Sequence, residues 1–121
     1  MAQRVVVLGA SPKPERYANQ AVRDLLAYGH TVLPIHPQAA EIHGQPCVKN
    51  LQGIEGAVDT LTLYVGADKS TALMDQILLL KPKRIIFNPG TENPALEQQA
   101  QAQHIETVQG CTLVMLRTHL F

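Results

Sequence analysis

The feature that most constrains the fold is an alternation of two apolar patterns along the 121 residues. Residues 4–8 (Arg-Val-Val-Val-Leu) form a short β-branched run that ends at Gly9. A run without polar alternation is typical of a strand buried on both faces. Between Ala18 and Leu26 the apolar residues instead recur at helical spacing, and Gly29 stands where a helix C-cap belongs.

The same alternation continues toward the C-terminus. Short apolar runs predict further strands at residues 31–35, 59–65, 84–87 and 105–108. Helical spacing between Ala72 and Leu80 predicts a second helix, which Pro82 ends, and Asn93-Pro94 fits the N-cap and first residue of a third. The polar segment 41–53 should contain only a short extended piece.

Strands that alternate with helices predict βαβ units. The expected fold class is therefore α/β: a three-layer, Rossmann-like, open and mostly parallel sheet with helices on both faces. At 121 residues the chain fits one domain, residues 1–121.

Charge and cysteine content exclude several classes of protein. Ten Lys and Arg balance ten Asp and Glu, whereas proteins that hold nucleic acid or anionic membranes carry a marked excess of basic residues. No apolar run approaches the roughly 20 residues that span a bilayer, and no signal peptide is evident. Two cysteines are too few for a secreted disulfide scaffold, which favours reduced thiols and a cytoplasmic location.

Ligands of open parallel sheets bind beyond the carboxyl ends of the strands. This rule selects the segments that follow Leu8, Ile35, Val65 and Phe87. The first of them, residues 9–19, lies between a strand and a helix, where backbone N–H groups and the helix dipole favour an anion. Ser11 adds a hydroxyl there, and Arg16 adds a guanidinium suited to phosphate. An ordinary loop stiffened by two prolines is the alternative.

This loop matches neither of the common nucleotide motifs. It has one glycine where the dinucleotide fingerprint has three, and it lacks the Walker A lysine pattern. The second expected strand ends at residues 34–37 (Pro-Ile-His-Pro), without an acidic residue for a ribose hydroxyl. A hydride-transfer cofactor is therefore disfavoured.

Four segments carry a resemblance to a known family. They are residues 7–19 (Val-Leu-Gly-Ala-Ser-Pro-Lys-Pro-Glu-Arg-Tyr-Ala-Asn), 34–37 (Pro-Ile-His-Pro), 88–93 (Asn-Pro-Gly-Thr-Glu-Asn) and 110–111 (Gly-Cys). Together they resemble the small stand-alone CoA-binding proteins, which are similar to the N-terminal CoA-binding domain of the succinyl-CoA synthetase α subunit. The resemblance covers essentially the whole chain. It implies non-catalytic binding of coenzyme A or an acyl-CoA at the carboxyl ends of the strands.

The resemblance also implies the residues of the site, none of which is catalytic or a metal ligand. The pyrophosphate would be held by Gly9, Ala10, Ser11, Pro12, Arg16, Tyr17 and Asn19. The adenosine would lie against Pro34, His36 and Pro37, with Val65 on the adenine side, and the pantetheine along Asn88, Pro89 and Gly90.

The chain departs from the family pattern at two of these positions. Family members often carry Asn where this chain has His36, and Lys where it has Gln38. A lysine there is a natural partner for the 3′-phosphate that distinguishes coenzyme A from ADP. Lys13 and a protonated His36 are the two candidates to replace it.

Two further readings stay open. Cys111 lies just past the last expected strand, where its thiol could exchange disulfides with CoA, although a free cysteine is more commonly a small buried hydrophobe. Alternatively, the chain is a regulatory module that reads another adenine nucleotide, ADP or NAD. The apolar residues 113–116 and 120–121 either close the core or form a homodimer patch.

Overall fold

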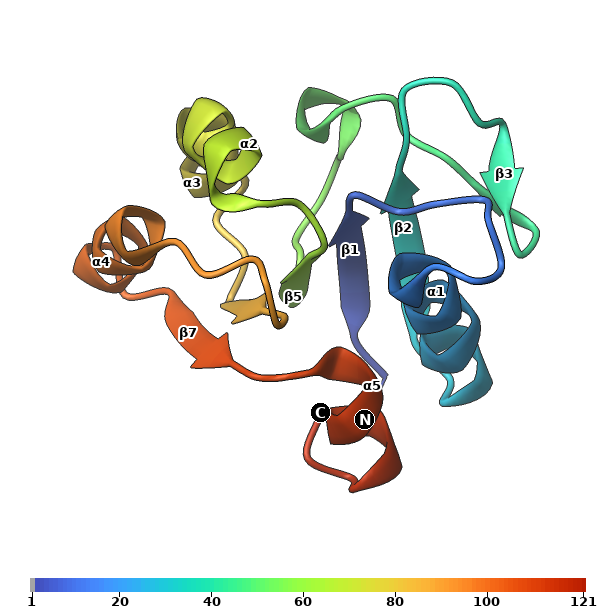
Figure 1. Cartoon of the computed structure of the whole chain (residues 1–121). Coiled ribbons are helices and arrows are strands. Elements are labelled where there is room, and N and C mark those ends of the chain that lie inside the picture. The colour runs from blue at the N-terminus through green and yellow to red at the C-terminus, as the bar shows by residue number, and fades with distance from the viewer. Residues whose placement is uncertain (1) are drawn as a thin grey trace.

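The computed structural model describes residues 2–121, and its centre is a five-stranded sheet. The strands are β1 (Arg4–Leu8), β2 (Thr31–Ile35), β5 (Thr60–Leu63), β6 (Arg84–Phe87) and β7 (Glu106–Gln109). They run in the order β2-β1-β5-β6-β7, and every neighbouring pair is parallel (Figure 1). The order reverses direction between β1 and β5, so this sheet has its topological switch point there.

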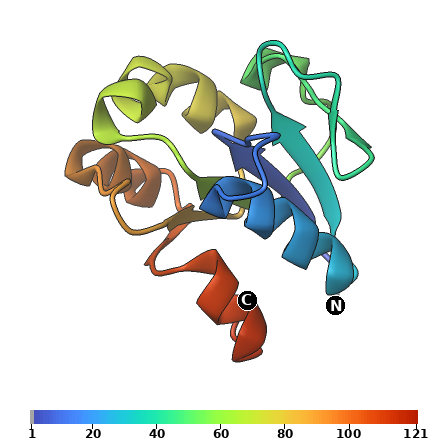
Figure 2. The same cartoon turned by 45° about the vertical axis from the view of Figure 1, so that its right-hand side comes forward.

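Helices cover both faces of the sheet. One face carries α1 (Tyr17–Ala27) and α5 (Thr112–Arg117), and the other carries α2 (Ala67–Ala72), α3 (Met74–Leu80) and α4 (Pro94–Ala102) (Figures 1 and 2). The expected three-layer α/β fold is thus confirmed. None of these helices is long and apolar enough to cross a membrane within the described residues.

The side chains of β1 are buried on both faces of the sheet. Successive side chains of a strand point to opposite faces. Val5 and Val7 pack with α1 and α5, whereas Val6 and Leu8 pack with α3 and α4. All four are at most 4% exposed, which accounts for the continuous apolar run in the sequence.

Two expected elements differ in the structure. The helix expected between Ala72 and Leu80 is two helices, because the chain leaves α-helical geometry at Leu73 (φ −101°, ψ 7°), and the first of them already begins at Ala67. The polar segment 41–53 holds a hairpin of β3 (Glu41–Ile42) and β4 (Gln45–Pro46), followed by the 3₁₀ helix η1 (Leu51–Gly53).

Strand boundaries differ by one or two residues. The strand expected at 59–65 is limited to Thr60–Leu63, and the one expected at 105–108 is Glu106–Gln109. The C-terminal apolar segment is the helix α5, in which Leu113 and Leu116 are buried and close the core. Val114 and Leu120, in contrast, are 51% and 71% exposed.

Candidate functional site

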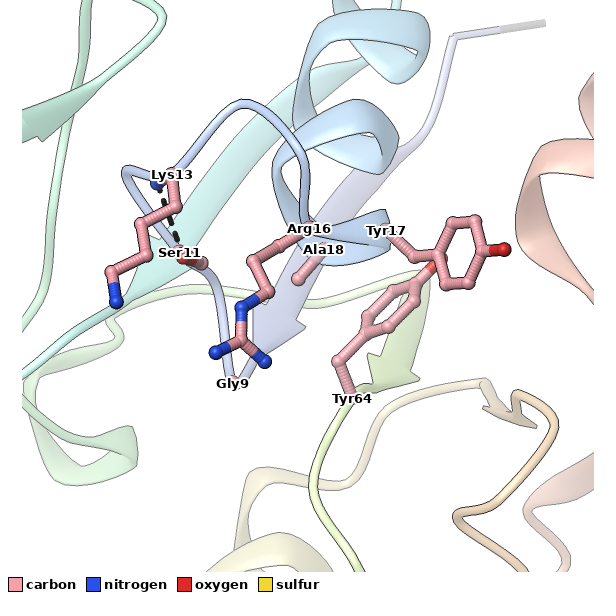
Figure 3. Close-up of a pocket in the computed structure, with 7 residues that line it drawn as sticks. All are labelled: Gly9, Ser11, Lys13, Arg16, Tyr17, Ala18 and Tyr64. Carbon is pink, nitrogen blue, oxygen red and sulfur yellow. Dashed lines mark hydrogen bonds between the residues drawn. The ribbon is translucent and has the colours of Figure 1, made fainter.

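Two adjoining clefts lie at the carboxyl ends of the strands. The first, of about 320 Å³, is lined by Gly9, Ser11, Lys13, Arg16, Tyr17, Ala18 and Tyr64 (Figure 3). The second, of about 400 Å³, is lined by Tyr17, Gln20, Tyr64, Asn88, Pro89, Cys111, Leu113, Val114 and Arg117. The clefts adjoin because Tyr17 and Tyr64 line both. The site therefore extends from the loop after β1, past the end of β5, to the end of β6 and to α5.

Gly9 allows the loop after β1 to pass close to the end of β5. Its φ is +91°, which other residues rarely adopt. A Cβ atom at this position would lie 2.7 Å from the carbonyl oxygen of Tyr64 and 2.8 Å from Cγ1 of Val65. Only glycine fits between the two segments.

Asn19 holds the loop after β1 in place through hydrogen bonds of its side chain. Its Nδ2 donates to the carbonyl oxygen of Ser11 (2.9 Å), and its Oδ1 lies 2.7 Å from Nε2 of His43, in the turn of the β3–β4 hairpin. Asn19 is 4% exposed, and both ends of its amide have partners within the protein. It therefore positions the loop and does not line either cleft.

Two cations line the first cleft. Lys13 and Arg16 are exposed, and neither forms an ion pair with an acidic side chain of residues 2–121. The backbone N–H of Lys13 donates to Oγ of Ser11 (3.1 Å), and that of Arg16 donates to the carbonyl oxygen of Lys13 (3.1 Å). In Figure 3 both charged side chains leave the loop on the same side. The first cleft is thus a cationic site, and no ion pair within residues 2–121 neutralises its two charges.

Tyr64, which was not predicted from the sequence, lines both clefts. Its hydroxyl is buried beside the hydroxyls of Thr62 and Thr112, yet it makes no hydrogen bond of good geometry within the described chain. Burial raises the pKa of Tyr64 well above its ordinary value. The expected strand ran to Val65, which placed Val65 and not Tyr64 at the edge of the sheet. Since β5 ends at Leu63, Tyr64 is the first residue beyond it.

Asn88 lies beneath the second cleft and joins three elements. Its Nδ2 donates to Oγ1 of Thr62 and to the carbonyl oxygen of Leu63, both at 2.7 Å, and its Oδ1 accepts the backbone N–H of Thr112 at 2.9 Å. The side chain is buried, with 2% of the residue exposed. Asn88 therefore holds β5, β6 and α5 together with all of its amide groups.

The remaining wall of the second cleft comes from α5 and the segment before it. Leu113, Val114 and Pro89 supply apolar surface, Arg117 supplies a cation, and the thiol of Cys111 is half-buried. Of these residues, Cys111 and Pro89 were predicted from the sequence. The residues of α5 were not, because the apolar segment 113–116 carries no signal that it forms a helix beside the site.

The residues expected around an adenosine lie outside both clefts. Pro34 is buried in β2, and Pro37 is exposed beyond its end. Nδ1 of His36 accepts the backbone N–H groups of Gln38 (3.1 Å) and Ala39 (2.8 Å). His36 is thus engaged in its own turn.

Taken together, the structure brings part of the expected set to the clefts. It places Gly9, Ser11, Arg16 and Tyr17 on the first cleft, and Tyr17, Asn88 and Pro89 on the second. Eight expected residues line neither cleft: Ala10, Pro12, Asn19, Pro34, His36, Pro37, Val65 and Gly90. Of these, Ala10 packs into the core with Val22, and Pro12 and Gly90 are exposed on their loops.

Comparison with known proteins places this geometry in context. Residues 3–117 match a family model described as a CoA binding domain. A solved structure described as an uncharacterized protein is 42% identical over 100% of this chain and 99% of its own, with a TM-score of 0.93. A Thermus thermophilus protein is 28% identical, with 99% and 91% of the two chains covered and a TM-score of 0.90.

A third similar structure belongs to a much longer protein. It is a dinucleotide-forming acetyl-coenzyme A synthetase from Ca. Korarchaeum cryptofilum, 26% identical, with a TM-score of 0.74. The match covers 89% of this chain and 25% of the synthetase. A search of curated proteins found no match.

Proposed function

The chain belongs to the CoA binding domain family, and on this premise we propose that it binds coenzyme A or an acyl-CoA without converting it. The observation that carries the proposal is the pair of adjoining clefts along the carboxyl ends of the strands. The first has two cations, and the second has more apolar walls. Coenzyme A has the same two parts, since its phosphates are joined to a long, mostly uncharged pantetheine.

The first cleft offers three kinds of phosphate donor. Arg16 presents a guanidinium fork, which suits a pyrophosphate. Ser11 accepts a backbone N–H with its hydroxyl oxygen, so the hydroxyl hydrogen is available to donate. The helix α1 begins at Tyr17 without a side-chain cap, which leaves backbone N–H groups of its first turn for an anion.

The second cleft would then take the pantetheine. The rings of Tyr17 and Tyr64 connect it to the first cleft, and Pro89, Leu113 and Val114 line its apolar part. In this arrangement the thiol end of the ligand lies in the second cleft, the one that Cys111 lines. The likeness to a part of an acetyl-coenzyme A synthetase supports the same class of ligand.

Calorimetric titration with CoA, ADP and NAD tests this proposal. We expect CoA to bind and the variant Arg16→Gln to lower its affinity about 10-fold or more, because hydrogen bonds between charged groups contribute roughly 1.5–3 kcal/mol. Arg23→Gln is the matched control, since Arg23 is an exposed arginine of α1 that lies outside both clefts. No binding of CoA at millimolar concentration would refute the proposal. Equal binding of all three would favour a module that reads adenine nucleotides generally.

A second candidate function is thiol–disulfide exchange with CoA, favoured by the half-buried Cys111 in the wall of the second cleft. The Cys111 thiolate would attack one sulfur of CoA disulfide. The old S–S bond breaks, a Cys111–CoA disulfide forms, and the second CoA leaves as a thiolate.

Mass spectrometry after incubation with CoA disulfide distinguishes this function from simple binding. We expect one CoA adduct, which Cys111→Ser abolishes and Cys47→Ser retains. Burial raises the pKa of Cys47, which lowers its thiolate fraction and makes it a suitable control. An adduct that persists in Cys111→Ser would eliminate this candidate.

A further inference from the structure

We propose that Lys13 recognises the 3′-phosphate of the ligand and thereby makes the site specific for coenzyme A over nucleotides that lack this group. The inference rests on the proposed function, because it assigns one residue of the first cleft to one group of that ligand.

The order of residues along the clefts is the first argument. In Figure 3, Ser11 and Lys13 lie on one side of Arg16, and Tyr17 and Tyr64 lie on the other. Tyr17 and Tyr64 lead into the second cleft, so Lys13 is at the far end of the first. In coenzyme A the pyrophosphate lies between the pantetheine and the phosphorylated ribose. With the pantetheine in the second cleft and the pyrophosphate at Arg16, the ribose and its 3′-phosphate would lie at the end of the first cleft that Lys13 lines.

The charge of the cleft is the second argument. Lys13 and Arg16 are the two cations among the residues that line the first cleft. A terminal phosphate monoester carries roughly −1.5 to −2 charges at pH 7, in addition to the charges of the pyrophosphate. An arginine fork suits the pyrophosphate, and a lysine is a compact charge with three donors that suits a terminal phosphate.

The backbone holds these two side chains in a defined relation. The N–H of Arg16 donates to the carbonyl oxygen of Lys13, so the two residues begin and end one turn. The N–H of Lys13 is fixed by Oγ of Ser11. Lys13 is therefore presented by an ordered loop, three residues before Arg16.

The alternative residue, His36, has its Nδ1 engaged elsewhere. Its Nδ1 accepts two backbone N–H groups, from Gln38 and Ala39. His36 is thus engaged in its own turn and lies outside the first cleft, whereas Lys13 lines it.

A comparison of two ligands and three variants tests the assignment. CoA and 3′-dephospho-CoA are titrated calorimetrically into the wild type, Lys13→Gln and Arg16→Gln. We expect Lys13→Gln to lower the affinity for CoA about 10-fold and to leave that for 3′-dephospho-CoA within about twofold, since only the first ligand loses a charge-assisted hydrogen bond. Arg16→Gln should weaken both ligands by a similar factor. Lys13→Arg, which retains the charge, should keep most of the preference for CoA.

Lys83→Gln is the matched control, because it removes the same charge just before β6, at the amino ends of the strands and away from both clefts. Equal weakening of both ligands by Lys13→Gln would place Lys13 at the pyrophosphate and overturn the inference. An unchanged affinity for both would show that Lys13 makes no contact. Either result leaves wild-type CoA binding intact, whereas failure of the proposed function would appear as absence of CoA binding. Thermal melts confirm that each variant folds.

Discussion

Asn19, Asn88 and Asn93 belong to the segments that resemble the CoA-binding family, and each is at most 4% exposed. Each uses its side-chain amide to join separate segments of the chain near the carboxyl ends of the strands. Asn93, for example, accepts the N–H of Leu96 at the start of α4 and donates to Oγ of Ser70 in α2. A buried amide is stabilising only when its donors and acceptors are paired, so these positions are specific for asparagine. Asn19 and Asn93 therefore build the site without lining either cleft, whereas Asn88 does both.

Gly9→Ala should damage both stability and binding. The φ of +91° disfavours any side chain by about 1–2 kcal/mol, and the added Cβ would also lie 2.7 Å from the Tyr64 carbonyl oxygen. We expect the free energy of unfolding to fall by at least that amount in chemical denaturation, with a parallel loss of CoA affinity. Gly66→Ala is the control, because Gly66 has a φ of −70° and open space around it. Equal effects of the two substitutions would contradict this account.

Tyr64→Phe should change how stability depends on pH. Burial raises the pKa of Tyr64, so the folded protein holds this proton more tightly than the unfolded chain does. The resulting stability is present below the unfolded pKa of about 10 and is lost as the pH rises through the higher folded pKa.

Unfolding curves measured between neutral pH and alkaline pH should therefore show a smaller alkaline loss in Tyr64→Phe than in the wild type. At neutral pH the variant should be as stable as the wild type or more so, by up to about 1 kcal/mol, since it removes a buried hydroxyl without a good hydrogen bond. Tyr28→Phe, an exposed tyrosine outside both clefts, is the control. A large loss of stability at neutral pH would show that the hydroxyl is paired in solution.

Among the elements, α5 depends most on polar contacts at the site. It has six residues, too few to be stable alone, and its first N–H groups need partners. The N–H of Thr112 donates to Asn88, and the hydroxyl of Thr112 lies 2.8 Å from that of Thr62. Leu113 and Leu116 add apolar burial.

Asn88→Ala should therefore loosen α5 from the sheet. It removes three buried hydrogen bonds, to Thr62, Leu63 and Thr112, and leaves the Thr62 hydroxyl with only that of Thr112 as its side-chain partner. We expect a loss of roughly 2–4 kcal/mol in the free energy of unfolding. Hydrogen exchange should show the Thr112 amide exchanging much faster, together with the rest of α5. Asn50→Ala, which removes the exposed cap of η1, should affect neither α5 nor global stability to this extent. Retained protection at Thr112 would refute the role of Asn88.

Elements that depend on local pattern were predictable from the sequence. The strand β1 was predicted with its observed bounds because all of its central residues are apolar on both faces. Asn93-Pro94 also predicted the start of α4, since an N-cap and a first-turn proline are local signals. The break between α2 and α3 at Leu73 contains no glycine or proline, so the sequence gives no signal for it. The strands β3 and β4 have two residues each, too few to show an alternation of apolar and polar residues.

The site was predictable only where it follows directly from a strand end or from the resemblance. The loop 9–19 met both conditions, and it supplies most of the first cleft. Tyr64 and the α5 residues Leu113, Val114 and Arg117 gave no such signal, because their place in the second cleft depends on how α5 folds back onto the sheet. Their role is set by tertiary contacts that no local pattern encodes.

For the whole molecule, charge is balanced overall and unbalanced at the site. The chain has a formal net charge of zero, so its distant field does little to attract an anion. Within residues 2–121, the two cations of the first cleft form no ion pair with an acidic side chain. Attraction of a polyanionic ligand should therefore be local and should depend on these two residues.

Salt dependence of CoA binding measures this local attraction. Between about 0.01 M and 1 M salt the Debye length falls from roughly 30 Å to 3 Å, so contacts with exposed charges weaken strongly. We expect the affinity of the wild type to fall steadily over this range, and the slope against the logarithm of salt concentration to be shallower in Lys13→Gln. Lys83→Gln changes the net charge equally, but Lys83 lies at the amino ends of the strands, so the slope of this variant should match the wild type. Equal slopes in all three would mean that Lys13 takes no part in attracting the ligand. A shallower slope in both variants would mean that net charge, and not the cleft, governs binding.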